Sequence, residues 1–177
     1  MSINDTGAPL SMDAQHTNRY ALAVNDMQEV QQYLQSYHSI KQLLAVDSQD
    51  VIKTACQGIL SAAIVAYCRP FLGNHSEGFA TRRVDASQLK SVTFRRALHD
   101  LLIQKRNSFI AHADWSARKA EVVISGTNDI HAAYTAPDVL AGLDLQEFLI
   151  LAGLVFHECL GKTLEHGLAA QSGTPAS

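Results

Sequence analysis

DSQDVIKTACQGILSAAIVAY, residues 47–67, predicts a long and largely apolar helix. Asp47 or Ser48 favours a helix start, because either side chain can accept a hydrogen bond from the first backbone N–H groups. The apolar residues that follow recur in steps of three and four, which is typical of a helix: Val51, Ile52, Ala55, Cys56, Ile59, Leu60, Ala63, Ile64 and Tyr67. So wide an apolar stripe needs neighbours on more than one side, so we predict the central helix of a bundle, ending at Pro70.

Three further segments show helical spacing. The first runs from Val24 to Leu44, with Asn25 or Asp26 as its cap, and another runs from Phe94 to Lys105. The last opens at Asp144, where a glutamate three residues later forms a capping-box-like start, and continues to Leu164. Together these segments predict an all-α fold, an up-down bundle of four to five helices.

Residues 119–134 interrupt the helical pattern. A β-rich run at 119–125 is followed by turn residues at 126–129 and a second run at 130–134, which predicts a small β-hairpin inserted between helices. The polar start, residues 1–18, and the small, breaker-rich end, residues 169–177, predict disordered tails. We therefore expect one helical domain over residues 19–168.

Composition points away from membrane and disulfide-bonded classes. No apolar run approaches the roughly 18 uncharged residues of a membrane span, and residues 1–5 lack the basic and apolar regions of a signal peptide. Cys56, Cys68 and Cys159 lie in separate segments with no Cys-x-x-Cys pair, so we expect reduced core thiols. The chain is expected to be cytoplasmic, with no membrane partner.

The histidines do not show metal-ligand spacing. His157-Glu158 could begin a metalloprotease pattern, but Gly161 stands where the second histidine belongs. His157 is expected to be a hydrogen-bonded core or interface residue. His99, seven residues before Arg106 and close to the same helix face, is expected to be solvated, with a place at the border of the cleft as the alternative. We expect neither a metal site nor another cofactor.

Charge is unevenly distributed. The whole chain carries −3, yet residues 82–119 hold nine basic side chains against three acidic ones, a net charge of +6, and the remainder therefore carries −9. A locally basic segment suits an anionic ligand. Solvated helix faces are the alternative for any single basic pair.

Within this basic segment lies Arg106-Asn107-Ser108-Phe109-Ile110-Ala111-His112. Arginine presents a planar fork of donors to phosphate, and histidine, with an ordinary pKa of about 6.5, transfers protons near neutrality. The pattern indicates phosphodiester chemistry without a metal. A purely structural alternative remains open, in which Arg106 pairs with Asp100 or Asp114 and His112 bonds a backbone carbonyl as the helix ends.

The motif resembles that of the HEPN (higher eukaryotes and prokaryotes nucleotide-binding) superfamily, an arginine followed four to six residues later by histidine. Ala113-Asp114 looks like the bacterial Ala-His-x-Asp variant, and residues 66–71 are similar to the Tyr-x-Arg-Pro-Phe segment of many members. The resemblance covers roughly residues 27–167. It implies a helical bundle, a homodimer and, in many members, a metal-independent endoribonuclease acting as a toxin, with an antitoxin partner, or in phage defence. Other members only bind nucleotides or serve structural roles.

The resemblance also implies roles for individual residues. His112 would be the general base or acid, and Arg106 would neutralise the phosphoryl oxygens. Asn107 would orient the scissile group or fix the tautomer of the histidine, and the product would be a 2′,3′-cyclic phosphate. Contacts with RNA would come from Lys105 and Asp114, which lie beside the motif, and from Arg69. Arg69 could equally cap its own helix.

Helix geometry favours a dimer independently of the resemblance. On an ideal α-helix, Arg106 and His112 lie about 120° apart around the axis and about 9 Å apart along it. One helix therefore does not aim both side chains at one atom. A composite site across a two-fold axis could do so.

Overall fold

The computed structural model describes residues 12–43, 49–72, 83–111, 120–125, 129–134 and 141–172, and most of them are helical, as predicted. The elements, in chain order, are α1 (Met12–Leu43), α2 (Gln49–Cys68), η2 (Ala86–Gln88), α3 (Lys90–Phe94), α4 (Arg96–Lys105), η3 (Arg106–Ala111), β1 (Ala120–Ser125), β2 (Asp129–Tyr134) and α5 (Leu145–Ser172).

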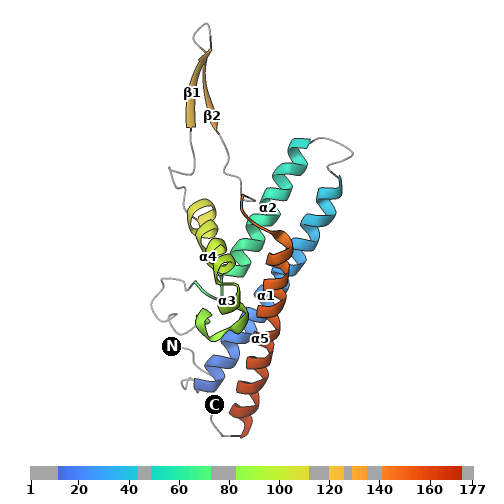
Figure 1. The fold of residues 1–177 in the computed structure, drawn as a ribbon, viewed down its shortest axis with the longest axis vertical. Coiled ribbons are helices and arrows are strands. Elements are labelled where there is room, and N and C mark those ends of the chain that lie inside the picture. Colours follow the sequence, from blue (N-terminus) through green and yellow to red (C-terminus); the bar gives the residue numbers. More distant parts are fainter. Residues whose placement is uncertain are drawn as a thin grey trace, which may run out of the picture.

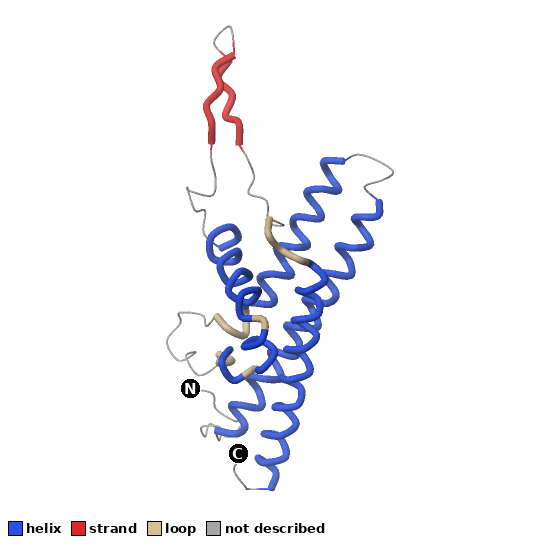
Figure 2. Tube along the Cα trace, viewed as in Figure 1, coloured by secondary structure: helices blue, strands red, loops and turns tan. Residues whose placement is uncertain are grey.

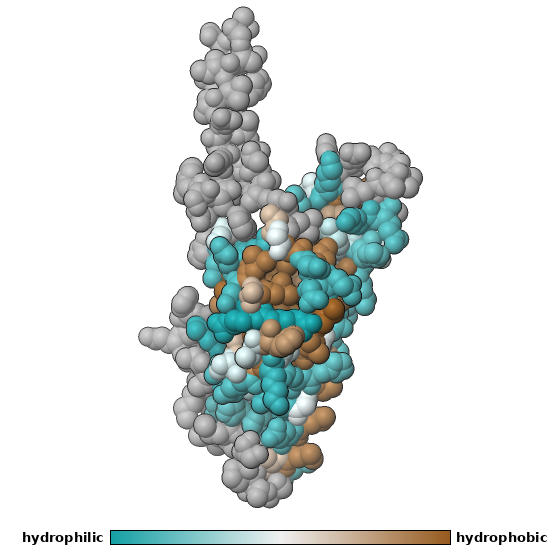
Figure 3. Space-filling view, in the orientation of Figure 1, coloured by the Kyte–Doolittle hydropathy of each residue, from teal (hydrophilic) through white to brown (hydrophobic). Residues whose placement is uncertain are grey.

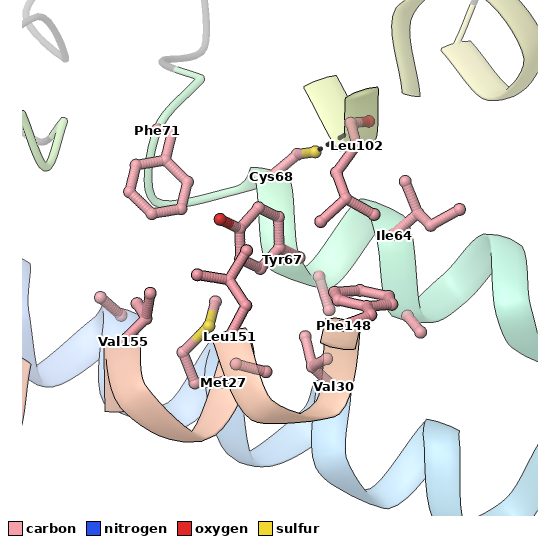
Figure 4. Packing of buried hydrophobic residues seen from close by; sticks show 14 of the residues in the cluster. Met27, Val30, Ile64, Tyr67, Cys68, Phe71, Leu102, Phe148, Leu151 and Val155 are labelled. Carbon is pink, nitrogen blue, oxygen red and sulfur yellow. Dashed lines mark hydrogen bonds between the residues drawn. The ribbon is translucent and has the colours of Figure 1, made fainter. Parts of the chain in front are cut away.

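The long helices α1 and α5 run antiparallel and form the main packing interface, and α1 also packs along α2 (Figure 1). The shorter α3 and α4 lie to one side of this group, with α3 against α5 and α4 against α2. Side chains from four helices meet in the core (Figure 4), with none of these residues exposed: Met27 and Val30 of α1, Ile64 and Tyr67 of α2, Leu102 of α4, and Phe148, Leu151 and Val155 of α5.

Helix α2 is the central helix that residues 47–67 predict. From Cys56 onward its apolar stripe is buried, but Val51 in the first turns is 73% exposed. Residues Val51–Cys68 are long and apolar enough, by length and composition, to span a membrane, although Lys53 interrupts the uncharged run. The core helix of a bundle has the same character, and α2 packs as one.

The helices extend further than the predicted tails allow. Helix α1 begins at Met12 and α5 continues to Ser172, so residues 12–18 and 169–172 are helical. Contacts between these two helix ends stabilise the extra turns. The His166 ring stacks on His16, with centroids 5.1 Å apart, and on Tyr20, with centroids 5.8 Å apart.

The predicted helix from Phe94 to Lys105 is broken near its start, because Phe94 is the last residue of α3 and α4 begins at Arg96. Arg95 separates α3 from α4 with a non-helical backbone (φ −111°, ψ 39°), and its Nε lies 3.0 Å from Glu147 Oε2 of α5. Phe94, an apolar residue at the start of that predicted segment, is 82% exposed. At the start of α5, Asp144 Oδ1 accepts hydrogen bonds from the backbone N–H groups of Gln146 and Glu147, which confirms the predicted cap.

Strands β1 and β2 form an antiparallel ladder, drawn in red in Figure 2. Its register runs from Ala120 opposite Tyr134 to Ser125 opposite Asp129. The ladder extends beyond the ends of the helices instead of lying along one of them (Figure 1).

Candidate functional site

The Arg106 motif begins where α4 passes into η3, a single π-helical turn over Arg106–Ala111. The Arg106 side chain is partly buried, and its Nη1 donates a hydrogen bond to Asn107 Oδ1 at 3.0 Å. His112 and Asp114 lie outside the described residues. The structure therefore places the arginine and the amide of the predicted site, and the role of the histidine stays a prediction.

The π-helical turn changes the geometry that the sequence suggests. Hydrogen bonds from residue i to i+5 widen the turn relative to an α-helix, and single π-helical turns are frequent at functional sites. The separation of 120° calculated for Arg106 and His112 assumes α-helical geometry, so it does not describe this segment.

Contacts with α2 hold the Arg106 end of α4 in place. Cys68 Sγ donates to Leu102 O at 3.6 Å, one helical turn before Arg106 (Figure 4). Burial raises the pKa of the Cys68 thiol to about 12, and the nearby Arg106 charge acts in the opposite direction. The end of α2 and the start of η3 therefore form one packed unit that fixes the position of the motif.

Arg69 does not cap its own helix. Its Nη1 lies 3.0 Å from Asp26 Oδ1 and 2.8 Å from Glu29 Oε2, both on α1. Burial raises the pKa of Asp26, and the hydrogen bond from Arg69 opposes that shift. Because two carboxylates neutralise the Arg69 guanidinium, this side chain is a poor candidate for phosphate contact.

Lys105 also differs from its expected place. It is only 3% exposed, so it lies in the interior and not on a surface that RNA could reach. Its spacing from Leu98 and Leu102, seven and three residues earlier, puts it on the buried face of α4.

Carboxylates neutralise two of the arginines of the basic segment. Arg95 pairs with Glu147, and both oxygens of Asp100 accept hydrogen bonds from Arg96 Nε. Asp100 is therefore engaged by Arg96 and not by Arg106, which removes one of the two acidic partners that the structural alternative offers to Arg106.

A buried pair that sequence reasoning missed lies next to the motif helix. Tyr67 Oη and His99 Nδ1 are 2.9 Å apart, and the Phe71 ring packs edge-on against the imidazole with centroids 4.8 Å apart. His99 is 4% exposed, so the expectation of a solvated residue was wrong. Burial lowers the pKa of His99, which favours the neutral imidazole.

A cavity of about 420 Å³ lies beside His99. Two arginines, Arg83 and Arg96, and two aspartates, Asp85 and Asp100, border this cavity, so the positive and negative charges of its lining balance.

No group of three His, Cys, Asp or Glu side chains within the described part of the chain is placed to hold a metal ion. The three cysteines are free and buried, which confirms the prediction of core thiols.

No protein-family model matches the chain, and no curated protein and no solved structure matches it either.

Proposed function

We propose that this protein binds RNA through Arg106 and cleaves it without a metal. In this proposal the helices form a HEPN-like bundle with an inserted β-hairpin, and the protein acts as a homodimeric, cytoplasmic endoribonuclease of a toxin–antitoxin or phage-defence system. The resemblance of the Arg106 to His112 motif supplies the reaction class. The local surroundings of Arg106 supply the physical support.

One observation carries the RNA-binding part of the proposal. Arg69, Arg95 and Arg96 each hydrogen-bond a carboxylate, whereas Arg106 donates to the neutral amide of Asn107. A carboxylate cancels the charge of a guanidinium, but an amide orients it and leaves the charge available. Among these four arginines, Arg106 is therefore the one best suited to a phosphate oxygen.

The proposed reaction needs stabilisation of negative charge and transfer of protons. Arg106 would stabilise the negative charge that develops on the phosphoryl oxygens, with Asn107 fixing the orientation of the guanidinium. His112 would remove the proton of the ribose 2′-hydroxyl or protonate the 5′-oxygen leaving group, and the same residue of a partner subunit would take the other role. The products would be a 2′,3′-cyclic phosphate and a free 5′-hydroxyl.

A second candidate is a non-catalytic module that binds a nucleotide or another protein. The burial of Lys105 and the ion pairs of Arg95 and Arg96 favour it, because they leave fewer cations to hold a long RNA. This candidate predicts binding of a short anion at Arg106 without strand cleavage.

Incubation of purified protein with labelled single-stranded RNA in EDTA separates the two candidates. The enzyme predicts cleavage that His112→Ala abolishes and that leaves 2′,3′-cyclic phosphate ends. Arg69→Ala is the matched control, because its guanidinium is already neutralised, and it should cleave at the wild-type rate. Cleavage that persists in His112→Ala or requires Mg²⁺ would contradict the proposed mechanism, and binding without cleavage would favour the module.

A further inference from the structure

The cavity beside His99 lies where α4 packs against the end of α2. Ligand sites of helical bundles lie between helices in this way, and the volume of about 420 Å³ falls within their usual range of about 300–1,000 Å³. The walls come from three parts of the chain that meet only in the folded protein: the segment just after α2, residues 83–86, and α4. The reaction proposed for Arg106 gives this cavity no role.

The cavity lies on the same side of α4 as Arg106. Arg106 has α-helical backbone angles (φ −58°, ψ −46°) and its N–H bonds to Leu102 O, so the geometry of α4 holds as far as this residue. At 100° and 1.5 Å per residue, Arg106 lies about 20° around the helix and about 10 Å along it from His99, which borders the cavity. Burial raises the pKa of the Cys68 thiol and the Arg106 charge opposes that shift, so Arg106 also lies near the end of α2.

A second groove flanks the other side of α4. Figure 3 shows apolar surface there, near the middle of the view, between α4 and α5. Ala97 and Leu101 line this groove, and they lie about 180° and about 140° from Arg106 around the helix. Of these two hollows along α4, the cavity beside His99 is therefore the one on the Arg106 side.

The lining of the cavity suits a flat, neutral ligand. Phe71 and Ile103 provide apolar walls, and two arginines and two aspartates provide polar ones. Because these four charges cancel, the cavity has little net attraction for a phosphate, yet each charged group remains a strong hydrogen-bonding partner. The unpaired bases of RNA are flat and neutral, and proteins bind them by stacking on aromatic rings and by hydrogen bonds to their edges.

Several polar groups of the lining have hydrogen-bonding capacity left. Arg83 takes part in none of the ion pairs of the described residues. The backbone N–H and the hydroxyl of Ser87 donate to Asp85 Oδ1 at 2.9 Å and 2.7 Å, which lowers the pKa of Asp85 and leaves Oδ2 outside these bonds. His99 is 4% exposed and uses Nδ1 in its bond with Tyr67, and no described residue bonds its Nε2.

We propose that this cavity binds a guanine base, that of the nucleotide next to the phosphate held by Arg106. Guanine presents two adjacent acceptors, O6 and N7, for which an arginine fork is the usual partner, and it also carries N–H donors. Arg83 supplies the fork, and Asp85 supplies a carboxylate oxygen for the donors. The inference rests on RNA binding by Arg106 and names the RNA that this site prefers.

The other bases match the cavity less well. Adenine carries an amino donor beside N7, in the place of the guanine O6 acceptor, and would set this donor against the Arg83 guanidinium. The single ring of a pyrimidine covers less of the apolar wall that Phe71 and Ile103 form. A guanine in the cavity would hold the neighbouring phosphate at Arg106, so cleavage should occur beside guanosine.

Three labelled heptamers, UUUGUUU, UUUAUUU and UUUCUUU, test the preference by fluorescence anisotropy in EDTA. The full chain should bind UUUGUUU about 5- to 150-fold more tightly than either of the others, the discrimination expected from one bidentate pair. Arg83→Gln should remove the preference and change the affinity for UUUAUUU by no more than about threefold. Arg83 is exposed, so the variant should keep the helical circular dichroism of the wild type. Arg69→Gln, outside the cavity, is the matched control and should keep the preference.

Free guanosine, which has no phosphate, tests the cavity apart from Arg106. In equilibrium dialysis, wild type and Arg106→Gln should bind guanosine equally and more tightly than adenosine, and Arg83→Gln should bind the two nucleosides alike. Guanosine binding by a protein that binds no RNA would support the cavity and overturn the function proposed for Arg106. Equal affinity for all three heptamers, or a preference for UUUGUUU that survives Arg83→Gln, would overturn the cavity assignment and leave RNA binding in place. Binding of neither RNA nor guanosine would overturn both.

Discussion

Replacing Glu158 with alanine should destabilise the protein far more than its partly exposed position on α5 suggests. The Glu158 carboxylate accepts hydrogen bonds from the backbone N–H groups of Lys90 at 2.9 Å and Ser91 at 3.0 Å, and from the Ser91 hydroxyl. Leu89, which precedes α3, makes no side-chain capping bond. Glu158 therefore caps the N-terminus of α3 from a residue 68 positions away and ties α3 to α5.

The magnitude follows from these three bonds. Hydrogen bonds to a charged group contribute about 1.5–3 kcal/mol each, and they are not additive when they share one carboxylate. Loss of a helix N-cap costs about 0.5–2 kcal/mol. We expect Glu158→Ala to lower the free energy of unfolding by about 2–4 kcal/mol, and Glu158→Gln by about half as much, since the amide keeps one acceptor oxygen.

Urea unfolding followed by circular dichroism measures this loss. With a slope of about 2 kcal/mol per M, a loss of about 3 kcal/mol lowers the midpoint by about 1.5 M without changing the slope. Glu165→Ala, at an exposed glutamate on the same helix, is the control and should shift the midpoint by less than about 0.3 M, as expected for a surface substitution. Equal midpoints for Glu158→Ala and Glu165→Ala would refute the cap.

Two further predictions concern buried titratable groups. Burial lowers the pKa of His99 below its ordinary value of 6.5, so the folded state binds fewer protons than the unfolded state, and the free energy of unfolding should fall as the pH drops below 6.5. Between pH 7 and pH 5, the urea midpoint should fall less in the double variant Tyr67→Phe/His99→Phe, which removes both members of the hydrogen-bonded pair, than in the wild type. An equal fall in the two proteins would exclude His99 as the source of the pH dependence. Burial also raises the pKa of the Cys68 and Cys159 thiols to about 12, so both thiols should resist alkylation by iodoacetamide at pH 8 in the native protein. Mass spectrometry maps the alkylated residues. Rapid labelling of either thiol before unfolding would contradict this prediction.

The helices themselves could be predicted from the sequence because their signal is local. Apolar spacing locates α2, and Asp144 caps α5 as its position predicts. The errors at helix ends come from contacts between distant residues. His166 stacks on His16 and extends α1 back to Met12, and Glu147 pairs with Arg95 at the break between α3 and α4. A periodicity within one segment contains no information about such partners.

The candidate site shows the same limit. The acidic partners of Arg69 lie 40 and 43 residues away, so its sequence neighbourhood could not show that its charge is neutralised. His99 and Tyr67 are 32 residues apart and meet only when α4 packs on α2. Lys105 is different, because its spacing from Leu98 and Leu102 already placed it on the apolar face of its helix. That signal was present and pointed to burial.

Fluorescence anisotropy in EDTA can compare the affinities of wild type and Arg106→Gln for single-stranded RNA, and so shows whether Arg106 binds phosphate. A charge-assisted contact to phosphate contributes about 1.5–3 kcal/mol, so Arg106→Gln should weaken binding by roughly 10- to 100-fold, and its salt dependence should be shallower. Arg69→Gln, which removes a neutralised guanidinium, should leave the affinity within about twofold of wild type. Equal affinities for wild type and Arg106→Gln would contradict the assignment of Arg106 as the phosphate-binding residue.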